Sequence, residues 1–124
     1  MDEEALAGLA DKLRTALSGA DLEQYAELLD PNVTWGEPGD PSPPCQNRQQ
    51  VLAWYSRGRA EGRRATVNEV TTYDRKILVA MTVTSADDGQ GFDRWQVLTV
   101  TGGRVSDIRG YDDEAAARAA AAGR

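Results

Sequence analysis

The chain has 124 residues, 40% of them hydrophobic and 27% charged, which is enough for one folded domain with its own core. Its net charge of −6 argues against nucleic-acid binding, which usually needs a basic face, and gives no reason to expect attachment to membranes. The sequence has no histidine and one cysteine, Cys45, which excludes a zinc constellation, a histidine-activated nucleophile and an internal disulfide. We therefore expect no metal and no cofactor. Acid–base chemistry would have to use Asp, Glu, Tyr, Lys or Cys.

The N-terminal end, Met1–Glu4, is acidic where a secretory signal would be basic and then apolar. No apolar run approaches the roughly 20 residues that span a bilayer. Together with the single cysteine, these features predict a cytoplasmic protein. We expect one domain over residues 1–124.

Two helices are predicted before the first strand. Leucines recur every three or four residues over 6–17, which indicates an amphipathic helix, and Gly19 suits its C-terminal end. Asp21 stands three residues before a glutamine, a capping pattern for a second helix over 22–29. Pro31 then ends this helix, because the residue before a proline is pushed out of the helical region.

Residues 33–35 predict a short strand, and the proline-rich segment 37–46 predicts a structured loop. Too few residues precede this loop for it to link two domains. A third helix is expected after Asn47, a typical N-terminal cap, and this helix carries Trp54 and Tyr55.

The second half of the chain predicts sheet. Its strand-like segments are separated by turn residues, among them a cluster over 87–91 and a Gly-Gly pair that suits positive φ. The alanine-rich tail 113–124 predicts a terminal helix that frays. Three helices followed by a four-strand meander, with one earlier strand, indicate an α+β fold. The four strands are expected over 65–73, 76–84, 92–101 and 104–110.

Four stretches carry a family resemblance: the link 19–22, the run 28–35, the pair 54–55 and the hairpin 95–105. With them the chain resembles the nuclear-transport-factor-2-like superfamily, in particular its SnoaL-like members, over nearly its whole length (6–113). The resemblance implies a cone-shaped roll in which the three N-terminal helices pack on a curved, mostly antiparallel sheet and enclose a pocket. It says less about function, because the superfamily includes isomerases, cyclases, hydrolases, dehydratases and plain binding proteins.

The resemblance also implies site residues. Ketosteroid-isomerase-like members carry an aspartate base before a proline, and Glu37, followed by Pro38, stands there in this sequence. A carboxylate in an apolar cavity has a raised pKa and can take a proton from carbon next to a carbonyl. The two oxyanion donors of those relatives correspond to Leu13, which cannot donate, and Gln96, which can. Tyr55 matches a tyrosine that supports the oxyanion network.

A second chemistry of the superfamily is disfavoured. Limonene-epoxide-hydrolase-like members use an Asp-Arg-Asp arrangement around a water, and their last aspartate falls at Gly110.

Alternation along the strand 92–101 places Arg94 and Gln96 on one face, which the resemblance turns into the cavity. A buried arginine needs a partner. We therefore expect Arg94 to pair with Glu37, to bind an anionic ligand, or to form a structural ion pair at the rim. Gln96 is either an oxyanion donor or a satisfied core amide, and Glu37 either a base or a solvated loop residue. Besides Tyr55, the predicted pocket wall consists of Leu13, Trp35, Trp54, Met81, Phe92 and Ile108.

The opposite face of the same strand carries Trp95 and Val97. These side chains would form an exposed apolar patch unless something covers them. Because relatives commonly bury this face in a two-fold dimer, we expect a homodimer.

Two functions follow from these features. In the first, the protein is a cofactor-independent isomerase- or cyclase-type enzyme acting on a small, mostly apolar carbonyl compound, with Glu37 as base and Gln96, Tyr55 and Arg94 stabilising the enolate. In the second, it is a non-catalytic ligand-binding or accessory domain, which the residues at positions 13 and 110 favour.

Overall fold

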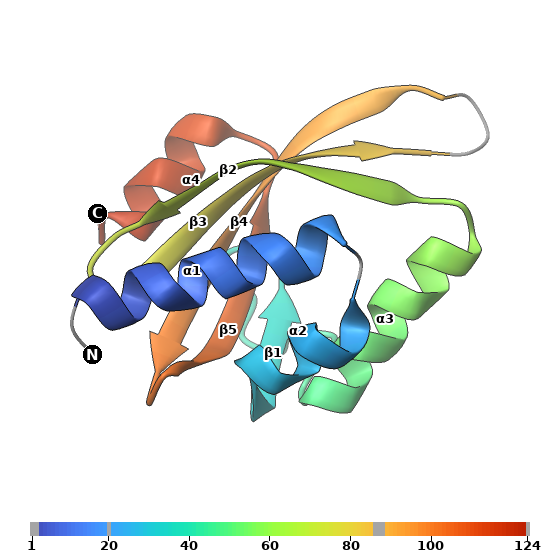
Figure 1. Ribbon diagram of the computed structural model, residues 1–124. Helices are drawn as coiled ribbons and strands as arrows, with labels where there is room; N and C mark the ends of the chain where they lie inside the picture. The colour runs from blue at the N-terminus through green and yellow to red at the C-terminus, as the bar shows by residue number, and fades with distance from the viewer. Residues whose placement is uncertain (1–2, 20, 86–88, 124) are drawn as a thin grey trace.

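The structure is a computed structural model that describes residues 3–19, 21–85 and 89–123 (Figure 1). Within these ranges the chain forms four helices and five strands. The helices are α1 (Glu3–Ser18), α2 (Leu22–Leu28), α3 (Arg48–Ala60) and α4 (Glu114–Ala121), and the strands are β1 (Leu29–Gly36), β2 (Arg64–Thr72), β3 (Lys76–Thr84), β4 (Gly91–Thr101) and β5 (Arg104–Tyr111).

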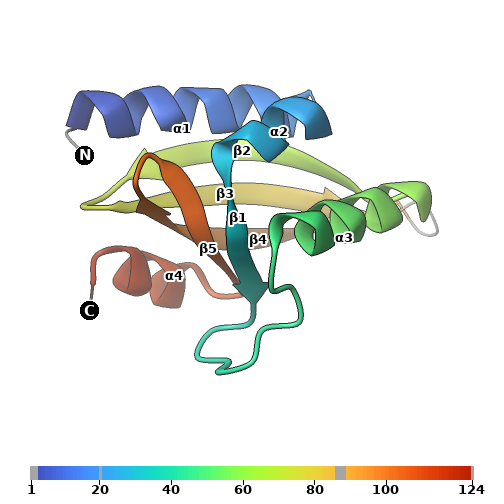
Figure 2. The same ribbon diagram turned by 90° about the horizontal axis from the view of Figure 1, so that it is seen from below.

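The strands form one curved, mixed sheet in the order β1-β5-β4-β3-β2. β1 runs parallel to β5, and the other neighbours are antiparallel. Helices α1 and α2 lie over one face of the sheet, α3 lies at its end, and α4 lies on the opposite face (Figures 1 and 2). The α+β class with three helices before the meander is confirmed. The sheet is open rather than closed into a barrel.

The leucine stripe of α1 forms the centre of the main core. Leu6, Leu9 and Leu13 are buried against side chains of the sheet. Both predicted caps are present, and each satisfies a backbone N–H that the first helical turn leaves open. The side chain of Asp21 accepts a hydrogen bond from the N–H of Gln24 (3.0 Å), and that of Asn47 from Gln50 (2.9 Å). None of the described helices is long and apolar enough to cross a membrane.

β1 is longer than the predicted strand 33–35 and begins directly after α2. Its register shifts between Leu29 and Thr34, in the segment that contains Pro31. Such an irregularity at a sheet edge accommodates a residue that has no N–H to donate. The loop that follows is held by two backbone hydrogen bonds between Trp35 and Cys45, 3.0 and 3.2 Å long.

The first and last turns of the meander contain residues with positive φ. Arg75 has a φ of 62° in the first turn, and Gly102 and Gly103 have φ values of 61° and 83° in the last. Of the turn cluster 87–91, residues 87 and 88 lie outside the described residues.

The C-terminal tail differs from the prediction. Instead of fraying, α4 packs on the outer face of the sheet, where Ala117 is 0% exposed and contacts the layer formed by Leu78 and Val97. Alanine side chains let the helix approach the sheet closely, and Lys76 Nζ donates to the carbonyl of Ala120 (3.1 Å). Because α4 covers Val97, the apolar patch that motivated a homodimer is largely satisfied within the chain. The homodimer stays a prediction.

Candidate functional site

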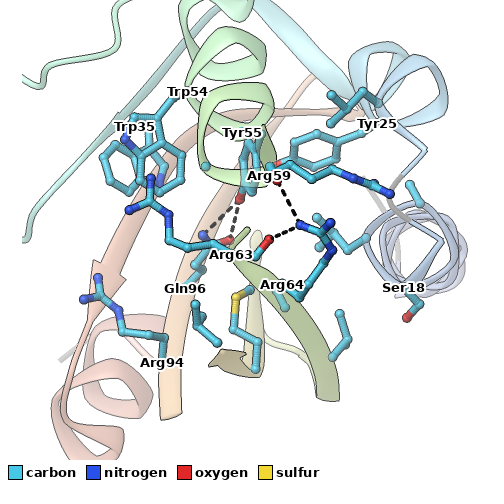
Figure 3. Close-up of a pocket in the computed structure, with 18 of the residues that line it drawn as sticks. Ser18, Tyr25, Trp35, Trp54, Tyr55, Arg59, Arg63, Arg64, Arg94 and Gln96 are labelled. Carbon is cyan, nitrogen blue, oxygen red and sulfur yellow. Dashed lines mark hydrogen bonds between the residues drawn. The ribbon is translucent and has the colours of Figure 1, made fainter. Parts of the chain in front are cut away.

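A cavity of about 510 Å³ opens between the concave face of the sheet and helices α1, α2 and α3 (Figure 3). Its wall comes from the end of α1, from α2 and α3, from the end of β1, and from β2, β3 and β4. Most of the lining is apolar and includes Leu17, Leu22, Trp54, Val67, Met81 and Val83.

Four aromatic rings in contact form one side of this cavity. Trp35 and Trp54 stack with ring centroids 4.3 Å apart and planes tilted by 34°. Edge-to-face contacts then join Trp54 to Tyr55 (5.4 Å) and Tyr55 to Tyr25 (5.3 Å). Such contacts fix ring orientation and hence the positions of the two hydroxyl groups. The predicted wall residues Trp35, Trp54 and Tyr55 all line the cavity.

Inside the cavity, Tyr55 and Gln96 form a polar pair. Gln96 Nε2 donates to the Tyr55 hydroxyl oxygen at 3.1 Å, while Gln96 Oε1 lies 3.5 Å from the same oxygen. Because the contact from Gln96 Nε2 is the shorter, the Tyr55 oxygen accepts this hydrogen bond. The hydroxyl hydrogen of Tyr55 is then available for another acceptor. Burial raises the pKa of Tyr55 even though the bond from Gln96 lowers it, so at neutral pH this hydroxyl is a donor.

Tyr25 brings a second hydroxyl to the cavity and is only 1% exposed. Neither its oxygen nor the indole nitrogen of Trp35 has a hydrogen-bond partner within the described part of the chain. Burial, with a smaller contribution from Tyr55, raises the pKa of Tyr25 well above its usual range. A buried donor left without a partner costs about 1–3 kcal/mol, and because each of these two atoms has less than 1 Å² of accessible surface, a ligand could reach them only if neighbouring side chains moved.

Sequence reasoning had not selected Tyr25. The only signal was a tyrosine on the apolar side of a short helix, where a leucine would bury as much surface without a polar atom.

Glu37 lies at the rim of the cavity and is exposed. Its backbone carbonyl accepts a hydrogen bond from Arg109 Nη1 (2.9 Å), and Arg109 is held in turn by Asp107 (3.1 Å). The loop backbone is therefore anchored to β5, while the Glu37 residue itself stays exposed at the rim.

Arg94 pairs with Asp112, at 2.7 Å from Oδ1, and not with Glu37. Of the three expected arrangements, the structure has the rim ion pair, with a different partner. Gly110 makes room for the Arg94 side chain, because a Cβ at this position would lie 2.7 Å from Arg94 Nη2.

Two predicted wall residues do not reach the cavity. Leu13 and Ile108 are both 0% exposed and belong to the core beneath it, because other buried side chains of the main core surround them. Met81 lies in the wall, and Phe92 lies at the mouth with 53% of its surface exposed.

Three further arginines line the cavity: Arg59, Arg63 and Arg64. Sequence reasoning had not selected them either, although they form a visible cluster around the end of the third helix.

Other reactive groups contribute little. Burial raises the pKa of the Cys45 thiol, with a smaller opposite effect of Arg57, so this cysteine is a poor nucleophile. Among the described residues, no group of three or more Cys, Asp or Glu side chains gathers where it could hold a metal ion.

The family model of the SnoaL-like domain matches residues 10–108. No curated protein matches the sequence.

Several solved structures share the fold. A candidate ketosteroid isomerase from Kribbella flavida is 22% identical, with a TM-score of 0.74, over 90% of this chain and 79% of that one. Bal32a, from a soil-derived mobile gene cassette, is 23% identical (TM-score 0.72; 93% and 94% covered). A candidate polyketide cyclase from Sinorhizobium meliloti is 20% identical (TM-score 0.67; 90% and 100% covered). At these identities the likeness establishes the fold.

Proposed function

The chain belongs to the SnoaL-like domain family, and on that premise we propose that it binds a small, mostly apolar carbonyl compound and transfers a proton at the carbon next to the carbonyl. The observation that carries this proposal is the hydroxyl of Tyr55, which Gln96 orients in an otherwise apolar cavity and which keeps its own hydrogen to donate. A carbonyl oxygen is an acceptor for such a donor.

The carbonyl oxygen would accept a hydrogen bond from Tyr55, and Gln96 would orient Tyr55 through its 3.1 Å bond. As the enolate forms, negative charge grows on that oxygen, and donors held in a water-poor site stabilise this charge more than the neutral ground state. Because burial raises the pKa of Tyr55, this side chain stays protonated and acts as a donor rather than a base.

Glu37 is the base in this proposal, since it is the one carboxylate that lines the cavity among the described residues. Its carboxylate takes the proton from carbon, and the C–H electron pair moves into the enolate. Where a carbon–carbon double bond is conjugated with the enolate, return of the proton from Glu37 to the γ-carbon completes an isomerisation. Attack of the enolate carbon on a second carbonyl of the same molecule, with the proton passing from Glu37 to the new alkoxide, completes a cyclisation. Neither outcome requires a cofactor.

A second candidate is ligand binding without reaction. The exposed position of Glu37 favours it, because a hydrated carboxylate is a weaker base than a desolvated one.

Exchange of carbon-bound protons in D2O separates the two candidates without knowledge of the natural product. Apolar ketones such as 2-tetralone would be followed by NMR with the protein, without it, and with Glu37→Gln, which keeps size but cannot accept the proton. We expect exchange above the uncatalysed rate with the native protein and a loss of about 100-fold or more with Glu37→Gln.

Tyr55→Phe should lower the same rate while leaving the base in place. Thermal stabilisation by the ketones with no accelerated exchange would contradict catalysis and support the binding role. Accelerated exchange that survives Glu37→Gln would remove Glu37 as the base.

A further inference from the structure

The charge of the cavity is opposite to that of the protein. The whole chain carries a net charge of −6, but the cavity lining contains four arginines and one acidic residue, Glu37. An excess of positive charge around an otherwise apolar pocket selects for anions and raises their local concentration.

Three of the arginines come from one short stretch. Arg59 lies in the last turn of α3, and Arg63 and Arg64 lie at the turn into β2. Arg94 comes from β4. In the view of Figure 3, the guanidinium groups of Arg63 and Arg94 lie to the left of Gln96, and those of Arg59 and Arg64 lie to its right. Cationic groups therefore flank the cavity on two sides.

Arg64 keeps part of its donor capacity open. Arg64 Nη1 donates to the backbone carbonyls of Arg59 (2.9 Å) and Arg63 (2.8 Å), so the side chain is positioned. Its Nε and Nη2 groups make no hydrogen bond to any described residue. A guanidinium held by one nitrogen, with two nitrogens open, suits a planar or tetrahedral oxyanion.

The ion pairs of Arg63 and Arg94 are solvent-exposed. Arg63 pairs with Glu61 at 3.0 Å, with about half of each side chain exposed, and Arg94 pairs with an Asp112 that is 81% exposed. Pairs of this kind are weak, and the acidic partners lie outside the lining. A ligand anion can thus compete with them or share the guanidinium groups.

We propose that the ligand is an organic anion, with its apolar body against the aromatic side of the cavity and a carboxylate or phosphate group at the mouth, bound by Arg64 together with Arg59 on the same side. This inference rests on the proposed function only in using the same cavity. The inference extends the proposed function by assigning the chemical class of the ligand, which is an acidic compound rather than a neutral one.

Two fluorescent probes test the proposal. The first, 8-anilinonaphthalene-1-sulfonate, is an apolar body with one oxyanion group, and N-phenyl-1-naphthylamine is the same body without it. Both would be titrated into the native full-length protein and into Arg64→Gln, with Arg104→Gln as the matched control. Arg104 is an exposed arginine at the start of β5, so its loss changes the net charge equally, but it does not line the cavity.

We expect Arg64→Gln to weaken binding of the sulfonate about three- to tenfold and to leave the neutral probe within about twofold. The double variant Arg59→Gln/Arg64→Gln should weaken the sulfonate further, and added salt should reduce the difference between the probes. An equal loss with Arg104→Gln, or an equal loss of both probes with Arg64→Gln, would overturn the proposal.

A steric variant separates this inference from the proposed function. Ala65 lines the cavity from the exposed part of β2, so Ala65→Trp should block the cavity and weaken both probes without disturbing the core. If it weakens neither, the probes bind elsewhere, and both the anion site and the ligand-binding function of this cavity fail.

Competition then identifies the anion. Displacement of the sulfonate probe by 4-phenylbutanoate or by phenyl phosphate supports the proposal and distinguishes carboxylate from phosphate. Displacement by neither acid, or equally well by neutral 4-phenylbutanamide, contradicts it.

Discussion

The two faces of the sheet differ in how completely they are filled. On the outer face, Ala117 and Ala121 of α4 pack against Leu78 and Val97 and leave these side chains buried. On the inner face, a cavity of about 510 Å³ remains between the sheet and helices α1, α2 and α3. The outer face gains stability from close packing, whereas the inner face retains a space of ligand size.

The largest effect is expected on the outer face. Ala117→Asp would place a carboxylate where the side chain is 0% exposed, and we expect it to lower the free energy of unfolding by about 3–5 kcal/mol. Urea denaturation followed by circular dichroism measures this. Ala115→Asp, on the exposed side of the same helix, is the matched control. Equal stability of the two variants would mean that α4 does not pack on the sheet in solution.

The second effect concerns the inner face at alkaline pH. Because burial raises the pKa of Tyr25, the unfolded chain loses this proton before the folded one does, from about pH 10 upward. Stability should therefore be complete below about pH 10 and fall as the pH rises further, by at most about 1.4 kcal/mol per pH unit for one such group. Urea midpoints between pH 8 and 11 should decline less steeply in Tyr25→Phe. Tyr111→Phe, outside this cavity, is the control, and an equal change in slope there would contradict the assignment.

The smallest effect distinguishes the two cavity tyrosines. Tyr55→Phe removes the acceptor of the 3.1 Å bond from Gln96 and should lower the free energy of unfolding by about 1 kcal/mol. Tyr25→Phe removes a hydroxyl that has no partner among the described residues and should be neutral or slightly stabilising. Thermal unfolding of both variants side by side tests this. A larger loss in Tyr25→Phe would show that its hydroxyl is bonded in solution, and would weaken its assignment as the free donor.

Local patterns explain why most elements could be predicted. The leucine spacing of α1, the caps Asp21 and Asn47, and the Gly-Gly turn depend on interactions within a few residues, and all are present in the structure. Alternation along β4 likewise placed Arg94 and Gln96 on one face, and the family resemblance identified that face as the cavity side. The family resemblance added the pocket itself, which periodicity alone does not predict.

Errors arose where an outcome depends on segments far apart in the chain. The alanine-rich tail has a helical pattern, but whether it frays depends on the sheet surface that receives it. Leu13 and Ile108 are apolar, as a pocket wall requires, but both side chains lie in the core beneath the cavity. Arg94 required a partner by its charge, and the geometry of the β5 end supplied Asp112.

The sequence by itself determined the α+β class, the element boundaries to within a few residues, the absence of histidine chemistry and the set of polar groups on the cavity side of β4. Only the tertiary structure decided which side chains line the cavity, that Glu37 lies at its solvated rim, that Tyr25 carries an unpaired hydroxyl, and that arginines from α3, β2 and β4 converge there. The physical reason is the range of the interactions. Helix and strand periodicity and capping act between neighbours in the chain, whereas burial, pairing and desolvation are set by packing between distant segments.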